Sequence, residues 1–211
     1  MLVDSRDVST SEHSARVGEL ARDLALELGW SQGNAEDMYL AGKLHDVGKV
    51  AMPDSILRKR GELTDVEWTI VRRHPLIGAE LVSHIDTLAH LAPIIRGHHE
   101  RYDGDGYPDG LCGEEIPFGA RVLAVADAID AMVSDRSYCS RMTVANARRR
   151  LRECAGTQFD PHVVVALDRR FASDPAFAEM LAQEPSAGPS GGSWGWISQR
   201  RWRDTQHSSS V

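Results

Sequence analysis

Apolar residues recur at helical spacing from near the start of the chain. Over residues 17–28 they occupy i, i+3, i+4 and i+7 positions, which predicts a helix that Gly29 ends. Asn34 is placed to cap a second helix with apolar positions over 38–44. We therefore expect two helices joined by a short turn.

Capping residues and prolines predict the limits of the helices that follow. Thr64 and Glu67 have the spacing of a capping box, and the helix that they open should end before Pro75. A further helix is expected over about 88–99, where Pro93 either kinks it or restarts it.

The later segments extend the helical pattern. We expect helices over 120–132, 143–154 and 161–170, whereas glycine and proline make 102–110 a loop. We find no alternation of apolar and polar residues long enough to predict a strand. The predicted fold class is therefore all-α, a helical bundle.

Composition changes towards the C-terminal end. Over 184–211 Ser, Gly and Pro are abundant and the periodic apolar positions cease, so we expect a disordered tail after one domain over 1–183. Trp194, Trp196 and Trp202 lie in this tail beside arginines. That pattern suits either a short contact motif or an extension without a selected role.

Charge and cysteine content limit the function classes. The chain of 211 residues carries 24 Lys and Arg against 31 Asp and Glu, a net charge of −7. This acidic balance lacks the excess of base that general nucleic-acid or anionic-membrane binding requires. No apolar run approaches the about 20 residues of a membrane span, no signal-peptide pattern is visible, and the three cysteines are widely spaced. These features predict a cytoplasmic globular protein.

Histidines and aspartates supply the candidate chemistry. Asp127 interrupts an apolar helix, where a carboxylate is costly unless it is paired or binds a cation. Imidazole and carboxylate are ligands of iron, manganese, zinc and nickel, and one carboxylate can bridge two ions. Two ions about 3.5–4 Å apart form a clamp for in-line displacement at phosphorus. The candidate set is His13, His45, Asp46, His74, His98, His99 and Asp127.

Two stretches that contain these residues resemble a known family. LHDVGK at 44–49 resembles the signature of the HD superfamily of metal-dependent phosphohydrolases, and HHERYDGDGYP at 98–108 resembles the defining stretch of the HD-GYP subfamily. The resemblance covers about residues 4–175. Further matches in the family's order are TSEHSARV from Thr10, His74-Pro75 with Gly78, Asp127 with Asp130, Asp135-Arg136 and Phe159-Asp160-Pro161.

The resemblance implies an HD-type helical bundle with an ordered GYP loop. It also implies a bacterial, cytoplasmic phosphodiesterase that hydrolyses cyclic di-GMP to linear pGpG, with a hydroxide between two divalent transition-metal ions, iron or manganese. All seven candidate residues match metal ligands of the family, and Asp46 would be the bridge. A homodimer, and a diguanylate cyclase or upstream sensor protein as partner, also follow from the resemblance.

Substrate-binding residues are implied in the same way. Lys49 would lie beside the scissile phosphate as a catalytic residue, where its charge suits the transition state. Arg136 would hold the other phosphate. Gly106, Tyr107 and Pro108 belong to the loop that names the family, and Gly106 and Pro108 are better suited to shaping the loop than to direct contact.

Three departures from the family limit the transfer. Ser9 replaces a glutamate that supports a third metal in some members, so two ions are expected. Cys139 stands where a basic residue often lies near the substrate. The helix that normally leads into the TSEHSARV segment is nearly absent, so we expect a truncated lead-in to the domain.

Two other functions stay open. The chain would be an HD-type hydrolase of another nucleotide if the base-reading pocket differs. It would be a catalytically silent module if it only senses cyclic di-GMP or docks on a protein partner. Metal analysis followed by chromatography of nucleotide digests separates these functions.

Overall fold

The computed structural model describes residues 8–59, 61–134 and 141–182, and within these ranges the regular structure is helical. No β-strand occurs in this part of the chain, where a single isolated bridge joins Ala155 and Phe159. The all-α prediction is confirmed. The predicted tail, Arg136 and Cys139 lie outside the described residues.

The helical elements follow one another with short connections. They are α1 (Val8–Glu27), α2 (Gln32–Leu44), the 3-10 helix η1 (Val47–Ala51), α3 (Asp54–Leu57), α4 (Asp65–Val71), α5 (His74–Ser83), η2 (Ala89–Leu91), α6 (Ala92–Gly97), η3 (Gly113–Glu115), α7 (Phe118–Val133), α8 (Val144–Glu153), α9 (Pro161–Ser173) and α10 (Pro175–Ala182).

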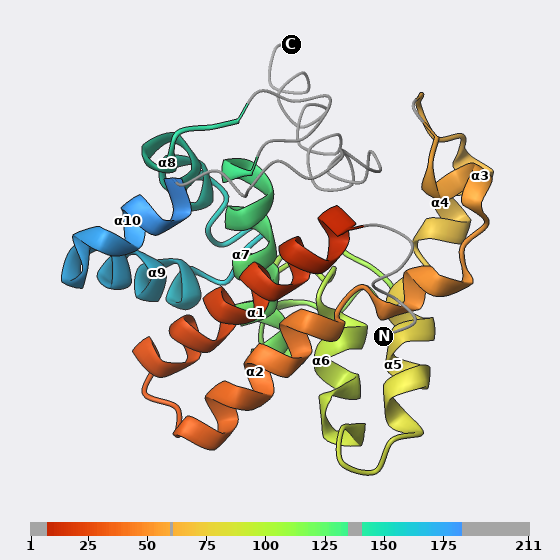
Figure 1. Cartoon of the computed structure of the whole chain (residues 1–211), viewed down its shortest axis with the longest axis horizontal. Helices are drawn as coiled ribbons and strands as arrows, with labels where there is room; N and C mark the ends of the chain where they lie inside the picture. Colours follow the sequence, from red (N-terminus) through yellow and green to blue (C-terminus); the bar gives the residue numbers. More distant parts are fainter. Residues whose placement is uncertain (1–7, 60, 135–140, 183–211) are drawn as a thin grey trace.

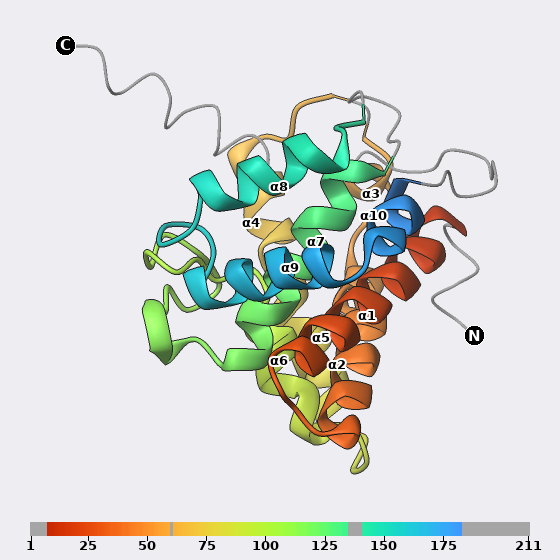
Figure 2. The same ribbon diagram turned by 90° about the vertical axis from the view of Figure 1, so that its left-hand side faces the viewer.

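The nearly uncharged α7 forms the centre of the bundle. Ten of its 16 residues are buried, and it contacts α1, α2 and α6 as well as α8, α9 and α10. Figure 1 shows α1 and α2 side by side, with α5 and α6 on one flank and α8–α10 on the other. In Figure 2, α9 passes across α7 and meets α1.

A second, smaller apolar cluster holds η1, α3 and α4 together. Its buried members are Met52, Ile56 and Val71, and Trp68 is among the half-buried residues that pack against them. Figure 1 shows α3 and α4 projecting beside the main bundle. The residues of α4 are therefore positioned by this small cluster rather than by the main core.

Most predicted helix limits are confirmed. Gly29, with φ +82°, follows the end of α1, and the predicted capping box of Thr64 and Glu67 opens α4. Pro93 lies in the first turn of α6, so the chain restarts there after η2.

Two of the expected limits are wrong. The hydroxyl of Ser31, and not Asn34, caps α2 by accepting from the Asn34 backbone N–H. The helix expected to reach His99 ends at Gly97. His98 and His99 therefore follow the helix, where the chain turns away from it.

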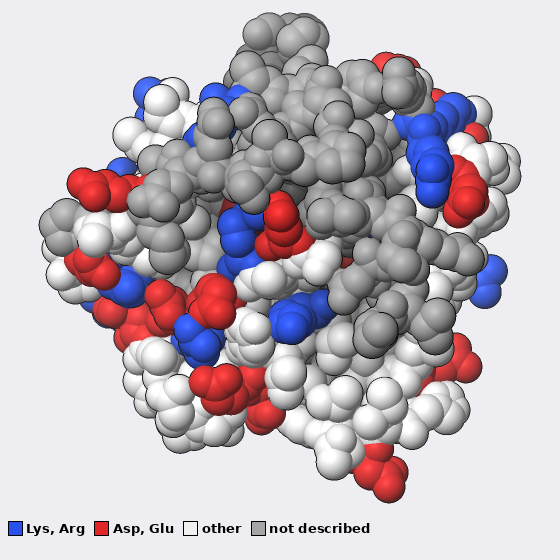
Figure 3. Space-filling view, viewed as in Figure 1, with Lys and Arg blue, Asp and Glu red and all other residues white. Residues whose placement is uncertain are grey.

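Charges of both signs mix over the described surface drawn in Figure 3, where Lys and Arg alternate with Asp and Glu. That distribution agrees with the acidic composition and gives this face no continuous basic patch within its described part. In the described ranges, none of the helices combines the length and the apolarity that crossing a membrane requires.

Candidate metal centre

Two glycines let α1 and α2 cross closely. A Cβ on Gly42 would lie 2.5 Å from the Cα of Gly18, and a Cβ on Gly18 would lie 2.7 Å from the Tyr39 carbonyl oxygen. Neither position has room for a side chain. This close crossing brings His13 of α1 near His45, with ring centroids 5.6 Å apart.

A third glycine brings the segment after His45 against the start of α5. A Cβ on Gly48 would lie 2.6 Å from the Gly78 nitrogen and would also collide with the His74 carbonyl oxygen. Because Gly48 has no side chain, η1 packs directly on the backbone of α5. Asp46 and His74 meet at this contact, with Oδ1 of Asp46 3.2 Å from Nε2 of His74.

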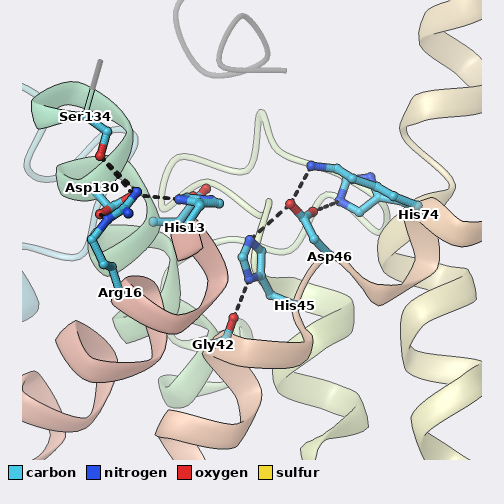
Figure 4. Close-up of polar contacts among 10 residues, drawn as sticks. His13, Arg16, Gly42, His45, Asp46, His74, Asp130 and Ser134 are labelled. Carbon is cyan, nitrogen blue, oxygen red and sulfur yellow. Dashed lines mark hydrogen bonds and ion pairs between the residues drawn. The ribbon is translucent and has the colours of Figure 1, made fainter. Parts of the chain in front are cut away.

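The candidate residues form two adjacent groups. Within each group the ligand atoms lie within 4.8 Å of one another. Asp46 lies between them: Oδ1 faces His74, and Oδ2 is 3.3 Å from Nε2 of His45 (Figure 4). The groups are His13, His45 and Asp127, and Asp46, His74, His98 and His99.

Backbone carbonyls orient three of the rings. Nδ1 of His45, His74 and His98 lies 2.6, 2.7 and 2.6 Å from the carbonyl oxygen three residues earlier in the chain. A carbonyl only accepts, so Nδ1 carries the proton, and in the neutral form of each ring Nε2 keeps its lone pair. Nε2 of His74 and of His98 is buried and has no hydrogen-bond partner in the described structure. Unpartnered lone pairs beside a carboxylate fit a divalent cation.

A carboxylate orients the ring of His13. Nδ1 of His13 lies 2.6 Å from Oδ2 of Asp130, whereas Nε2 lies 3.2 Å from Oδ1 of Asp127. Arg16 donates to Asp130 from Nε at 2.6 Å, and the Asp130 side chain is 1% exposed (Figure 4). Asp130 and Arg16 are not among the candidate residues that the sequence patterns predict. The signal was their spacing, since each follows a candidate ligand by three residues and so shares its helix face.

The electrostatics suit ligation. Burial would raise the pKa of Asp46, but Lys49, whose Nζ is 2.5 Å from Oδ2, and His45 hold that pKa well below its usual value. Burial and the neighbouring His45 and His74 lower the pKa of His98 to about 3. Burial also disfavours charge on His45, but the Asp46 carboxylate outweighs it and raises the pKa to about 8. The centre therefore keeps an ionised Asp46 beside a neutral His98, whereas His45 is protonated below about pH 8 without metal and would lose that proton on ligation.

Glu100 shapes the GYP loop (residues 102–110), a role that the sequence analysis missed. Its buried carboxylate accepts from the backbone N–H of Asp109 at 2.7 Å and of Leu111 at 3.2 Å. A Cβ on Gly106 would lie 2.5 Å from the Cα of Glu100 and would collide with the Arg101 nitrogen. The absence of a side chain at Gly106 is therefore needed for the shape of the loop.

A cavity of about 410 Å³ opens beside the two groups. His98, His99 and Asp127 line it, together with residues of α4 and with Gly106 and Tyr107 of the GYP loop. The Tyr107 ring stacks on His99 with centroids 4.9 Å apart and an interplanar angle of 29°. The Tyr107–Pro108 peptide bond is cis.

A helical bundle with two adjacent His and Asp groups beside a cavity defines a class of protein with a candidate two-metal centre. The chain belongs to the HD domain family, whose model matches residues 1–163.

Three curated relatives illustrate the similarity. The chain is 44% identical to "Cyclic di-GMP phosphodiesterase response regulator RpfG" of Xanthomonas campestris over 79% of this chain and 45% of that protein. It is 41% identical to a cyclic di-GMP phosphodiesterase of Thermotoga maritima over 79% of this chain and 46% of that protein. It is 39% identical to "3'3'-cGAMP-specific phosphodiesterase 2" of Vibrio cholerae over 78% of this chain and 32% of that protein. The chain spans about half, or less, of the length of these relatives.

Solved structures share the fold. A cyclic GMP-AMP phosphodiesterase of Vibrio cholerae (V-cGAP3) matches with a TM-score of 0.64 and 19% identity, over 82% of this chain and 46% of that one. The HD domain of the Listeria monocytogenes phosphodiesterase PgpH in complex with cyclic di-AMP matches with a TM-score of 0.62 and 17% identity, over 88% of this chain and 97% of that one. These matches confirm the HD-type helical bundle.

Proposed function

We propose that this chain is a metal-dependent phosphodiesterase that hydrolyses cyclic di-GMP to linear pGpG. The observation that carries the proposal is the pair of donor groups that meet at Asp46 beside the cavity. The substrate is supported by relatives named cyclic di-GMP phosphodiesterases, 41% and 44% identical to this chain.

The two groups suit two divalent ions, iron or manganese. Neutral imidazoles with carboxylates are the donor set that these metals take, and the buried Nε2 atoms lack another partner in the described structure. When bound, such ions would activate water and offset the negative charge of the phosphate. His13, His45 and Asp127 would hold one ion, His74, His98 and His99 the other, and Asp46 would contribute to both.

Lys49 and Tyr107 supply the remaining chemistry at the phosphate. Lys49 would place its ammonium group, already at Asp46, where it stabilises charge that develops on the phosphoryl oxygens. Burial raises the pKa of Tyr107 well above its usual value, so its hydroxyl stays a donor. That hydroxyl is buried and lacks a hydrogen-bond partner in the described part of the chain, so it is placed to donate to a phosphate oxygen.

The residue types at two positions favour hydrolysis of only one of the two phosphodiester bonds. A second cut requires the linear product to be held again by its more highly charged terminal phosphate. Ser9 brings no carboxylate for a third ion, and Cys139 brings no positive charge for the other phosphate. A charge-assisted bond from Arg136 alone is worth only about 1.5–3 kcal/mol. We therefore expect pGpG to accumulate.

The test is anaerobic purification, elemental analysis and timed chromatography of cyclic di-GMP digests. Asp46→Ala should remove most of the metal and abolish hydrolysis. Lys49→Ala should keep the metal and slow turnover about 10²- to 10³-fold. His84→Ala is the matched control, because Nδ1 of this exposed histidine also contacts a backbone carbonyl, that of Glu80, at 2.7 Å. Two metals and wild-type activity in Asp46→Ala would refute the ligand assignment.

Other outcomes bear on the finer points. One zinc ion or no metal in the wild-type chain would refute the two-ion proposal, and GMP that rises as fast as substrate disappears would refute the single cut. Faster cleavage of 3',3'-cGAMP than of cyclic di-GMP would favour the second candidate substrate, which a relative of 39% identity supports. A homodimer and a diguanylate cyclase or sensor partner stay predictions from the family resemblance.

A further inference from the structure

One wall of the cavity has no part in the metal centre. Trp68 and Thr69 of α4, and Arg72 at its C-terminal end, line the same cavity as His98 and His99. Trp68 packs against the small apolar cluster under α4, which fixes the position of its ring. The reacting phosphate would lie at the metal centre, so this wall is available to another part of the substrate.

A row of planar groups runs from the metal centre to α4. The Tyr107 ring stacks on His99 at 4.9 Å, and Cζ of Arg72 lies over the Tyr107 ring, 5.7 Å from its centroid. The same guanidinium lies over the Trp68 ring at 6.0 Å. The guanidinium of Arg72 therefore lies beside two aromatic rings, which contribute no hydrogen-bond acceptor atoms for its N–H groups.

Arg72 also differs from the cavity's other arginine. Arg101 donates to both carboxylate oxygens of Asp103, from Nε and Nη2. Around Arg72, no carboxylate of the described residues lies within ion-pair distance, 4.0 Å. In the described structure, therefore, the N–H groups of Arg101 bind an acidic side chain and those of Arg72 do not.

The aromatic surroundings favour a base over a phosphate. A phosphate gains little from flat apolar rings, whereas a nucleobase stacks on them favourably. Guanine presents two acceptors, O6 and N7, to a guanidinium fork. Adenine presents N7 and a donor amino group in the place of O6, so it cannot accept both N–H groups.

We propose that Arg72 determines specificity by donating its N–H fork to the O6/N7 edge of one guanine, with Trp68 and Tyr107 as the flanking rings. This inference rests on the proposed function, because it names how the cavity recognises the substrate base. A bidentate contact of this kind discriminates against the wrong base by about 5- to 150-fold.

The experiment measures binding and cleavage of two dinucleotides by the metal-loaded full chain. The binding probes are slowly hydrolysed phosphorothioate analogues of cyclic di-GMP and cyclic di-AMP, and the readout is the ratio of their Kd values. The wild type should prefer the guanine compound by about 5- to 150-fold. Arg72→Gln should lose this preference, because glutamine pairs with the N6/N7 edge of adenine. Arg72→Lys keeps the charge without the fork and should lose it as well.

Arg73→Gln is the matched control. It removes the same charge from the next residue, which is exposed and precedes α5, and it should leave the ratio unchanged. Metal content and melting temperature should be the same in all variants, since Arg72 is no metal ligand.

The outcomes separate the two proposals. If Arg72→Gln weakens both analogues equally, Arg72 holds a phosphate and the inference is overturned. An unchanged ratio also overturns it. If the wild type cleaves neither dinucleotide, the proposed function fails, and the Kd ratio still tests Arg72.

Discussion

Asp130→Asn tests whether the orientation of His13 limits metal binding. In the structure the Asp130 carboxylate is 2.6 Å from Nδ1 of His13 and 2.6 Å from Nε of Arg16, and it is 1% exposed. Asparagine keeps the volume but replaces one accepting oxygen with a donor, so it cannot satisfy both neighbours. Loss of such a partner costs about 10- to 100-fold in metal affinity, which corresponds to about 1.4–2.7 kcal/mol.

The position of His13 makes the effect selective. His13 belongs to the group with His45 and Asp127, whereas the group around His74 does not contact Asp130. We therefore expect one of two ions to bind about 10- to 100-fold more weakly and the other to keep its affinity.

The assay is a chelator competition with Mn²⁺ under anaerobic conditions, followed over both binding steps. Asp168→Asn is the control, because Asp168 also accepts from two arginines, Arg148 and Arg152, and is not part of either ligand group. Equal weakening of both steps in Asp130→Asn, or two unchanged steps with a lower melting temperature, would refute the reasoning.

Two further predictions concern stability. Gly48→Ala should lower the free energy of unfolding by about 3 kcal/mol or more and should reduce metal content, because a Cβ there would collide with the backbone of α5. Gly33→Ala is the control in thermal unfolding, because a Cβ at Gly33 would have no neighbouring atom nearer than 4.0 Å. In urea unfolding, the metal-free protein should be most stable near pH 6.5. Folding lowers the pKa of His98 from about 6.5 to about 3, so the free energy of unfolding falls as pH drops below 6.5. Folding raises the pKa of His45 from about 6.5 to about 8, so the free energy of unfolding also falls as pH rises from 6.5 towards 8. Each contributes a slope of about 1.4 kcal/mol per pH unit, and a monotonic profile over pH 5–8 would contradict this assignment.

Local signals explain which helices could be predicted. Gly29, the Thr64–Glu67 box and the apolar run of α7 act within a few residues, and the structure confirms each. The cap of α2 was assigned wrongly because Ser31 and Asn34 are both good capping residues, and only the extended backbone of Ser31 decides between them.

Pro75 shows how one residue can act at two helices. As a sequence signal it predicts only that the preceding helix ends, and α4 does end at Val71. The same proline lies in the first turn of α5, which begins at His74. Proline suits a first turn because its missing N–H would have no partner there. The helix after it was therefore not predicted from the sequence.

In the candidate site, too, some residues could be predicted from local sequence and others depend on distant contacts. The candidate ligands could be recognised because histidine and aspartate are conspicuous in apolar segments. The i+3 spacing of Asp130 is only a weak signal of its role, and Glu100 has no such signal, because each role depends on a contact with another segment of the chain. The partner of Asp130, His13, is 117 positions away in the chain.

The metal centre owes its geometry to the backbone more than to side-chain packing. Three rings are oriented by the carbonyl groups three residues earlier in the chain, and glycines set how closely the segments that carry the rings approach one another. This arrangement leaves the buried Nε2 atoms of His74 and His98 without hydrogen-bond partners in the described structure, which costs free energy in the metal-free protein. A bound cation would remove that cost only in the folded chain, because the candidate ligands come from α1, α5 and α7 and from the segments that follow α2 and α6. Binding of the proposed ions would therefore be coupled to folding, and the same glycines that allow the close helix contacts would limit how far the site can deform.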